Sequence, residues 1–180
     1  MRRSLIKFSL FISILIAAPA VYCQDTSDAV REKTRERLGA LLEREGPGIK
    51  VSFRQSEKNP FNFIGVLKEG LKNAESMEIV VMVSKRDTIG FRIFPHYKGG
   101  YINIDKVRNT TQLLRQLVQF NEKTFLFWGA DDTGDVFTGY TFTLESGFPD
   151  DAIKIVLASI KNSDQFVGEL KSSIDGTTTP

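Results

Sequence analysis

Few residues of this chain carry side chains suited to catalysis, and none lies in a recognisable catalytic pattern. His96 is the sole histidine and lies between Pro95 and Tyr97, where a strand pattern gives way to a turn. We therefore expect a surface imidazole in a loop rather than a general base. Ser146 lies in Glu-Ser-Gly rather than in the Gly-x-Ser-x-Gly motif of hydrolases, and the sequence has no Gly-rich phosphate loop. The sequence predicts a non-enzymatic protein with no catalytic residue and no cofactor.

Five aspartates form the remaining group with the chemistry of a small binding site. They are Asp131, Asp132, Asp135, Asp150 and Asp151. Carboxylates bind hard cations such as calcium, but an EF-hand loop requires a glutamate at its twelfth position, which is Phe142 when the loop is counted from Asp131. Hairpin turns favour aspartate, and so does the first turn of a helix. Because the chain also has one histidine and one cysteine, we expect no metal site.

The first 23 residues have the three-part composition of a secretory signal peptide. Three basic residues, the last of them Lys7, precede the uncharged and mostly apolar residues 8–18. This apolar run is too short to span a bilayer, which takes about 20 helical residues. Cleavage is expected after Ala20 or after Cys23, and both cuts leave a mature chain without a membrane span. We therefore expect an exported bacterial protein, periplasmic or secreted, with residues 1–23 as its signal peptide.

The charge of the mature chain argues against nucleic acid as a partner. The full chain has a net charge of +2, and residues 1–23 hold three basic residues and no acidic one, so the mature chain has a net charge of −1. It lacks the clustered basic surface that nucleic acid or anionic lipid requires. Cys23, the single cysteine, has no second cysteine with which to form a disulfide, so an apolar core must hold the fold together.

Hydrophobic periodicity divides the mature chain into helices and strands. We expect a charged N-terminal helical segment at 24–48, a single α+β domain at 49–174 and a flexible tail at 175–180. Within the domain, the pattern predicts a strand at 49–54, a short helix at 60–73, and strands at 77–84, 88–94 and 101–104. It then predicts a helix at 109–121, strands at 123–130 and 136–144, a helix at 152–163 and a short helical turn at 166–170.

Two of these helices carry clear apolar stripes. In the helix at 109–121, Asn109 is the expected N-cap, with Gln112 three residues further on. Its predicted core-facing residues are Leu113, Leu114, Leu117 and Val118, and those of the helix at 152–163 are Ile153, Val156, Leu157 and Ile160.

Three local patterns in the second half of the chain are specific enough to compare with known families. They are Leu-Leu-x-x-Leu-Val-x-x-Asn at 113–121, an aromatic strand that ends at an Asp/Gly hairpin at 125–135, and Glu-Ser-Gly-Phe-Pro-Asp-Asp at 145–151 before a helix. Together with the element order, they resemble the YbjN family of bacterial sensory transduction regulators over about residues 77–170. That family is similar in fold to the type III secretion chaperones, whose members pair and hold client chains.

The resemblance implies an α+β fold with a mainly antiparallel sheet of five or six strands packed with helices, in the order α-β-β-β-α-β-β-α. Members of this kind are commonly cytoplasmic. This chain differs from those members in its N-terminal region, where the sequence predicts an export signal and an additional charged helix.

The predicted strands are apolar on both faces, which a single layer of helices cannot cover. One alternate set faces the helices at 109–121 and 152–163, and comprises Ile79, Val81, Val83, Leu126, Trp128, Tyr140, Phe142 and Leu144. The opposite set includes Val80 and the candidate partner-binding residues Met82, Phe94, Phe125, Phe127 and Phe137. An exposed apolar patch of this size exceeds what a soluble monomer normally shows, so the second face requires a cover.

Several covers are open at this point. The helix at 29–42 or the segment at 60–73 would cover the face from within the chain, and a homodimer or a bound polypeptide would cover it from outside. We expect a non-enzymatic protein of the cell envelope that engages a protein partner, or a second copy of itself, through the aromatic face. One alternative is a small-molecule or lipid carrier whose ligand fills the space between that face and the N-terminal helices. A less favoured alternative is an enzyme with a carboxylate-based site.

Overall fold

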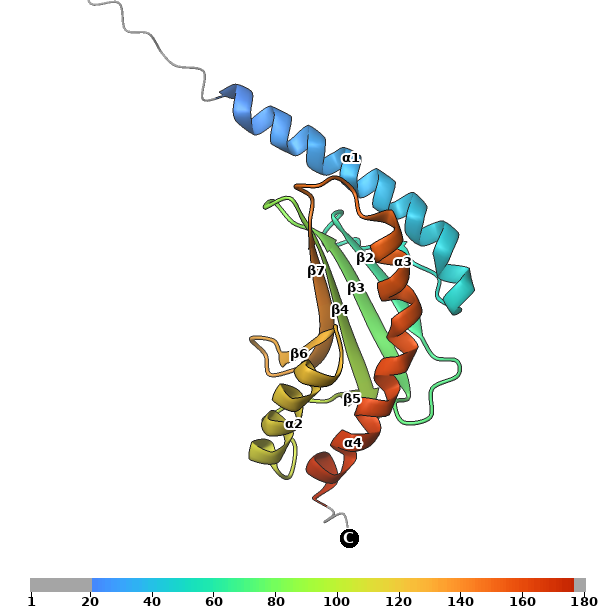
Figure 1. The fold of residues 1–180 in the computed structure, drawn as a ribbon, viewed down its shortest axis with the longest axis vertical. Coiled ribbons are helices and arrows are strands. Elements are labelled where there is room, and N and C mark those ends of the chain that lie inside the picture. Colours follow the sequence, from blue (N-terminus) through green and yellow to red (C-terminus); the bar gives the residue numbers. More distant parts are fainter. Residues whose placement is uncertain (1–20, 177–180) are drawn as a thin grey trace, which may run out of the picture.

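The computed structural model describes residues 21–176 (Figure 1). Its helices are α1 (Val21–Glu45), α2 (Thr110–Lys123), α3 (Asp150–Ser159) and α4 (Asp164–Asp175), with the short 3₁₀ turns η1 (Gly46–Ile49) and η2 (Ile160–Ser163). Its strands are β1 (Arg54–Gln55), β2 (Asn62–Leu67), β3 (Ser76–Val83), β4 (Thr88–Tyr97), β5 (Gly100–Tyr101), β6 (Phe127–Ala130) and β7 (Val136–Thr143). Except for residues 21–23, the expected signal peptide lies outside the described residues.

The strands form one antiparallel sheet in the order β1-β2-β3-β4-β7-β6, with β5 paired to β4. The longest ladder joins β3 to β4 and runs from Ser76 opposite His96 to Val83 opposite Ile89. The predicted α+β class with a mainly antiparallel sheet is confirmed. The sheet has seven strands rather than the predicted five or six, because the segment predicted as a helix at 60–73 contributes β2.

The helices pack on one face of this sheet (Figure 1). The residues of β3 alternate between buried and half-buried, and the buried ones belong to the same core as the apolar stripes of the helices. That core includes Leu38, Leu41 and Leu42 of α1, Leu113, Leu117 and Phe120 of α2, Ile153, Val156 and Leu157 of α3, and Phe166, Val167 and Leu170 of α4. Burial of these side chains is the main favourable contribution to folding.

The segment at 60–73 is a strand and a turn rather than the predicted helix. Phe63 and Leu67 of β2 face the helices, opposite Val81 and Met77 of β3. Gly65 lies between them on the same face, where a Cβ atom would lie 2.5 Å from the side chain of Val51. The side chain of Val51 therefore occupies the position where an apolar side chain of β2 would otherwise continue the alternation. The sequence consequently shows no clear strand pattern in this segment.

The segment predicted as a strand at 49–54 is mostly irregular. Gly46–Ile49 form η1, Lys50 adopts a left-handed conformation with φ of 60°, and regular pairing begins only at Arg54. Strand β4, in contrast, continues past Pro95 to Tyr97. The carbonyl of Pro95 accepts from the N–H of Ile102, so the side of the proline that lacks an N–H faces away from β3 and breaks no bond of that ladder.

The expected N-cap of α2 is present, since Asn109 accepts a hydrogen bond from the N–H of Gln112 at 3.0 Å. The predicted stripe of this helix is only half correct. Leu113 and Leu117 are buried, whereas Leu114 and Val118 are 43% and 71% exposed. The helix covers the outer edge of the sheet as well as its face, which turns these two residues outward.

Candidate interaction surface

The sheet face opposite the helices carries four adjoining aromatic rings, which we call the aromatic patch. Phe94 of β4, Tyr101 of β5, Phe127 of β6 and Phe137 of β7 share this face by strand register. The ring centroid of Phe94 lies 5.8 Å from that of Tyr101 and 5.7 Å from that of Phe137. The rings of Phe127 and Phe137 lie 5.6 Å apart and are nearly perpendicular. Aromatic pairs at these separations attract one another and form a stiff surface.

No described helix covers the aromatic patch. Phe127 and Tyr101 are each 40% exposed, Phe94 is half-buried, and Phe137 is buried beneath its neighbours although it lies outside the main core. The covers expected from within the chain lie elsewhere. Gly39 of α1 lies against the ring of Phe63 on the helix side of the sheet, and the segment at 60–73 is part of the sheet itself.

The position of α1 also bears on the carrier alternative. That alternative required a ligand space between the aromatic face and the N-terminal helices. Because α1 packs on the other face, the described residues do not form such a space.

Charged and polar groups lie among the rings of the aromatic patch. The guanidinium of Arg92 lies 4.6 Å from the ring centroid of Phe137, within the range of a cation–π interaction. Burial raises the pKa of the Tyr101 phenol to about 12, with the carboxylate of Glu78 as a further cause. The imidazole of His96 packs on the edge of Tyr101, with ring centroids 4.4 Å apart. The surface therefore offers apolar area together with one positive side chain, Arg92, and one negative side chain, Glu78.

The structure brings three of the five candidate partner-binding residues together. Phe94, Phe127 and Phe137 belong to the aromatic patch. Met82 lies on the same face but further along the strands, next to Gly90. Phe125 precedes β6, is 53% exposed, and packs on Tyr140, which belongs to the helix side of the sheet. A partner-binding role for these residues remains a prediction.

Two contributors to the surface were missed in the sequence, Tyr101 and Arg92. Tyr101 could have been found from the turn at Lys98-Gly99. A tight turn at that point pairs Tyr101 with His96, and this pairing places Tyr101 on the same face as Phe94. Arg92 is a charged residue within an apolar alternation, so hydrophobicity alone does not select it. Its aliphatic stem and planar head are instead compatible with packing on an aromatic ring.

The acidic loop has the hairpin role that turn chemistry predicts. One oxygen of Asp131 accepts hydrogen bonds from the N–H and hydroxyl of Thr133 and from the N–H of Asp135. Burial raises the pKa of Asp131, but these hydrogen bonds outweigh it and leave the pKa below its ordinary value. Across residues 28–176, no group of three or more His, Cys, Asp or Glu side chains is arranged to hold a metal ion.

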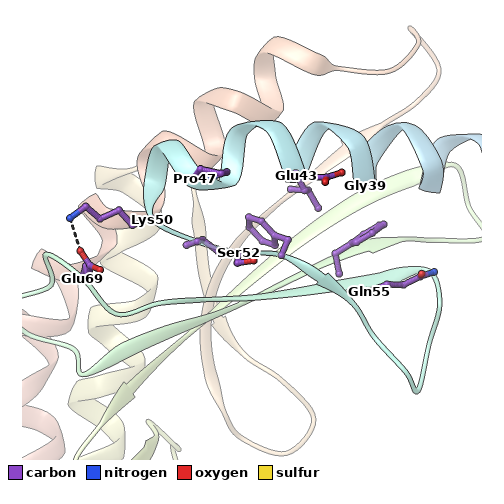
Figure 2. A pocket seen from close by; sticks show the side chains of 11 residues that line it. Gly39, Glu43, Pro47, Lys50, Ser52, Gln55 and Glu69 are labelled. Atoms are coloured by element: carbon purple, nitrogen blue, oxygen red, sulfur yellow. Dashed lines mark hydrogen bonds and ion pairs between the residues drawn. The ribbon is translucent and has the colours of Figure 1, made fainter.

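The two edge strands of the sheet, β6 and β1, have different neighbours on their outer sides. At the β6 edge, the N–H of Trp128 donates to the side-chain oxygen of Asn121 at 2.6 Å, and the side-chain nitrogen of Asn121 donates to the carbonyl of Trp128 at 3.3 Å. One amide of α2 thus takes the place of a neighbouring strand. At the other edge, a groove of about 720 Å³ lies between α1 and the segment that leads into β1 (Figure 2).

The chain was compared with known proteins. No family model matches it, and no curated protein matches it. The crystal structure of the ExsC–ExsE complex contains a chain that is 15% identical, with a TM-score of 0.43, over 76% of this chain and 94% of that chain. Similarity at this level carries no conclusion about partner or activity, and membership of the YbjN family remains a prediction. None of the helices described here is both long and apolar enough to cross a membrane.

Proposed function

We propose that this protein is non-enzymatic and binds a protein partner, or a second copy of itself, through the aromatic patch. One observation supports the proposal above others: four aromatic side chains adjoin on a sheet face that no described element covers. Full burial of a large apolar side chain contributes about 1.5–3 kcal/mol, and covering the 40% of Phe127 and of Tyr101 that is exposed would add part of this, so the patch favours association.

The chemistry of the patch is that of a protein interface. Aromatic residues and arginine supply most of the energy at protein interfaces because they bury large areas with few rotatable bonds. Phe137 lies at the centre of the patch, its ring packs on Phe94 and Phe127, and Arg92 lies against it. These contacts hold the rings in place before a partner arrives, which reduces the entropy lost on binding.

The proposal includes export of the protein to the periplasm or the medium. The composition of residues 1–23 supports it, since a basic start is followed by a short apolar run and small residues. The proposal also includes kinship with the YbjN family, which the motif pattern at 113–151 supports.

A photocrosslinking experiment tests the binding surface. We would incorporate benzoylphenylalanine at position 127 of the full chain, in the cells that produce it, and at position 155 as the control. Ile155 is a matched control because it is 59% exposed but lies on α3, on the helix side. We expect a crosslinked adduct from position 127 and none from position 155.

The mass of the adduct identifies the partner. An adduct of twice the chain's mass identifies a second copy, and any other mass identifies a different protein. No adduct at position 127, or adducts of equal yield at both positions, would contradict the proposal.

A further inference from the structure

The sheet ends at β1, whose outer side has no neighbouring strand among the described residues. β1 pairs only with β2 and is the terminal strand of the sheet. The N–H of Ser56 donates to the carbonyl of Asn62 at 2.8 Å, so the backbone of Ser56 faces β2. Hydrogen-bonded pairs alternate along an antiparallel ladder, so the backbone of Arg54 faces β2 and that of Gln55 faces outward. Outward N–H and carbonyl groups of this kind can pair with an added strand.

A groove runs beside this open edge, beneath α1 (Figure 2). Its volume is about 720 Å³, and its apolar lining comprises Leu42, Pro47, Val51, Phe53 and Phe63. Gly39 of α1 also lines it, and a Cβ atom there would lie 3.1 Å from the ring of Phe63. The groove therefore combines an apolar wall with the outward N–H and carbonyl of Gln55, and an extended peptide is recognised by this combination of apolar contact and backbone pairing.

The charges at the rim of the groove are unequal. At one end, Lys50 and Glu69 neutralise each other through a 2.5 Å ion pair. The same ion pair lowers the pKa of Glu69, through the hydrogen bond from Lys50 and its charge. Glu43 of α1 also lines the groove, and within residues 28–176 its carboxylate has no ion-pair partner. This carboxylate at the rim thus favours a ligand that carries a positive charge. It would speed the association of such a ligand and disfavour negatively charged ones.

We infer that the groove is a second binding site, which takes an extended polypeptide segment as an added strand on the outer edge of β1. The segment places apolar side chains against the groove wall and a basic side chain beside Glu43. This site is distinct from the aromatic patch, since its apolar wall belongs to the helix side of the sheet.

Fluorescence anisotropy with designed peptides tests the inference. The probe is a labelled peptide of about nine residues with alternating valine and threonine and one central lysine. Gln55→Pro removes the outward N–H of β1 and should weaken binding about tenfold, whereas Gln55→Ala keeps that N–H and should stay within about threefold. Glu43→Lys should weaken binding of the lysine peptide and strengthen binding of the same peptide with glutamate in place of lysine.

A second measurement does not depend on the fold of the proline variant. Methylating alternate backbone nitrogens of the peptide blocks the hydrogen bonds on one side of the strand, and shifting the pattern by one residue blocks the other side. We expect one methylation pattern to abolish binding and the shifted pattern to preserve it. Equal effects of the two patterns, or no saturable binding of the unmodified peptide at about 1 mM, overturn the inference.

The variant Phe127→Ser separates this site from the proposed function. Because Phe127 lies on the aromatic patch, the variant should leave peptide binding unchanged while it weakens association through the patch. Loss of peptide binding in this variant, with the fold intact, would place the peptide on the aromatic patch and refute the groove.

Discussion

Asp164 is the buried charged residue on which the loop between β2 and β3 depends. It lies at the start of α4 and is 7% exposed. Its carboxylate accepts hydrogen bonds from the backbone N–H groups of Lys72 at 2.7 Å, Asn73 at 3.1 Å and Ala74 at 2.8 Å. Asp164→Ala removes all of these acceptors at once and leaves an empty space beside the donors.

The magnitude follows from how far each donor is buried. Ala74 is buried and Asn73 is half-buried, so their N–H groups have little access to water, whereas Lys72 is exposed and its N–H can be hydrated. A buried donor without a partner costs about 1–3 kcal/mol, and a hydrogen bond to a charged group contributes about 1.5–3 kcal/mol. We therefore expect Asp164→Ala to lower the free energy of unfolding by about 3–5 kcal/mol. Asp164→Asn keeps one acceptor oxygen and should cost about half as much.

Urea denaturation followed by circular dichroism measures this loss. Asp151→Ala is the control, because that aspartate lies in the first turn of α3 with a side chain that is 92% exposed. It should change the free energy of unfolding by no more than about 0.5–1 kcal/mol. If Asp164→Ala costs no more than Asp151→Ala, the carboxylate does not anchor the loop and the reasoning is wrong.

Three further predictions follow from single contacts. The pKa of Tyr101 is raised to about 12, above the ordinary value of about 10. Its contribution to stability is therefore complete below about pH 10 and is lost as the pH rises toward 12. Ultraviolet titration, with the Tyr101→Phe variant subtracted, should show a late transition that Glu78→Gln moves to lower pH; an ordinary pKa contradicts this. Arg31 donates two hydrogen bonds, at 3.1 and 2.8 Å, to the last carbonyl of β3 and lies 3.5 Å over an aromatic ring. Arg31→Met should cost about 1–2 kcal/mol and speed hydrogen exchange in the first half of α1; unchanged exchange speaks against this anchor. A Cβ atom on Gly139 would lie 2.2 Å from a backbone oxygen of β4, so Gly139→Ala should cost about 3 kcal/mol or more in thermal denaturation. Gly48→Ala, which meets nothing within 4 Å, is the control, and equal losses in the two variants refute the argument.

Much of the fold could be predicted wherever a segment has one dominant period. The alternation in β3, the Asn109 cap of α2 and the apolar stripe of α3 each have a local physical cause, and the structure shows all three. The segment at 60–73 could not be predicted in this way. Phe63 and Leu67 satisfy both the helical and the strand period, and Gly65 carries no side chain to decide between them.

The candidate surface was predictable to a similar extent. Phe94, Phe127 and Phe137 share a face because each lies within a strand whose register the alternation sets. Phe125 does not share it, because β6 begins only at Phe127 and the alternation has no meaning before that point. The groove between α1 and the segment that leads into β1 could not be predicted. Its shape depends on where the pairing of β1 stops and on how α1 lies over that segment.

The amide of Asn121 has a consequence for how copies of this molecule can stack. A fibre of head-to-tail subunits requires that every molecule offer two exposed strand borders, one to accept a neighbour and one to be accepted. At one border, the N–H and carbonyl of Trp128 are bonded to a side chain of the same molecule, which disfavours addition of a strand there, whereas β1 at the other border has no outer neighbour among the described residues. This asymmetry disfavours growth along the strand-pairing direction beyond one added strand, so binding of an extended chain at β1 would not by itself lead to polymers.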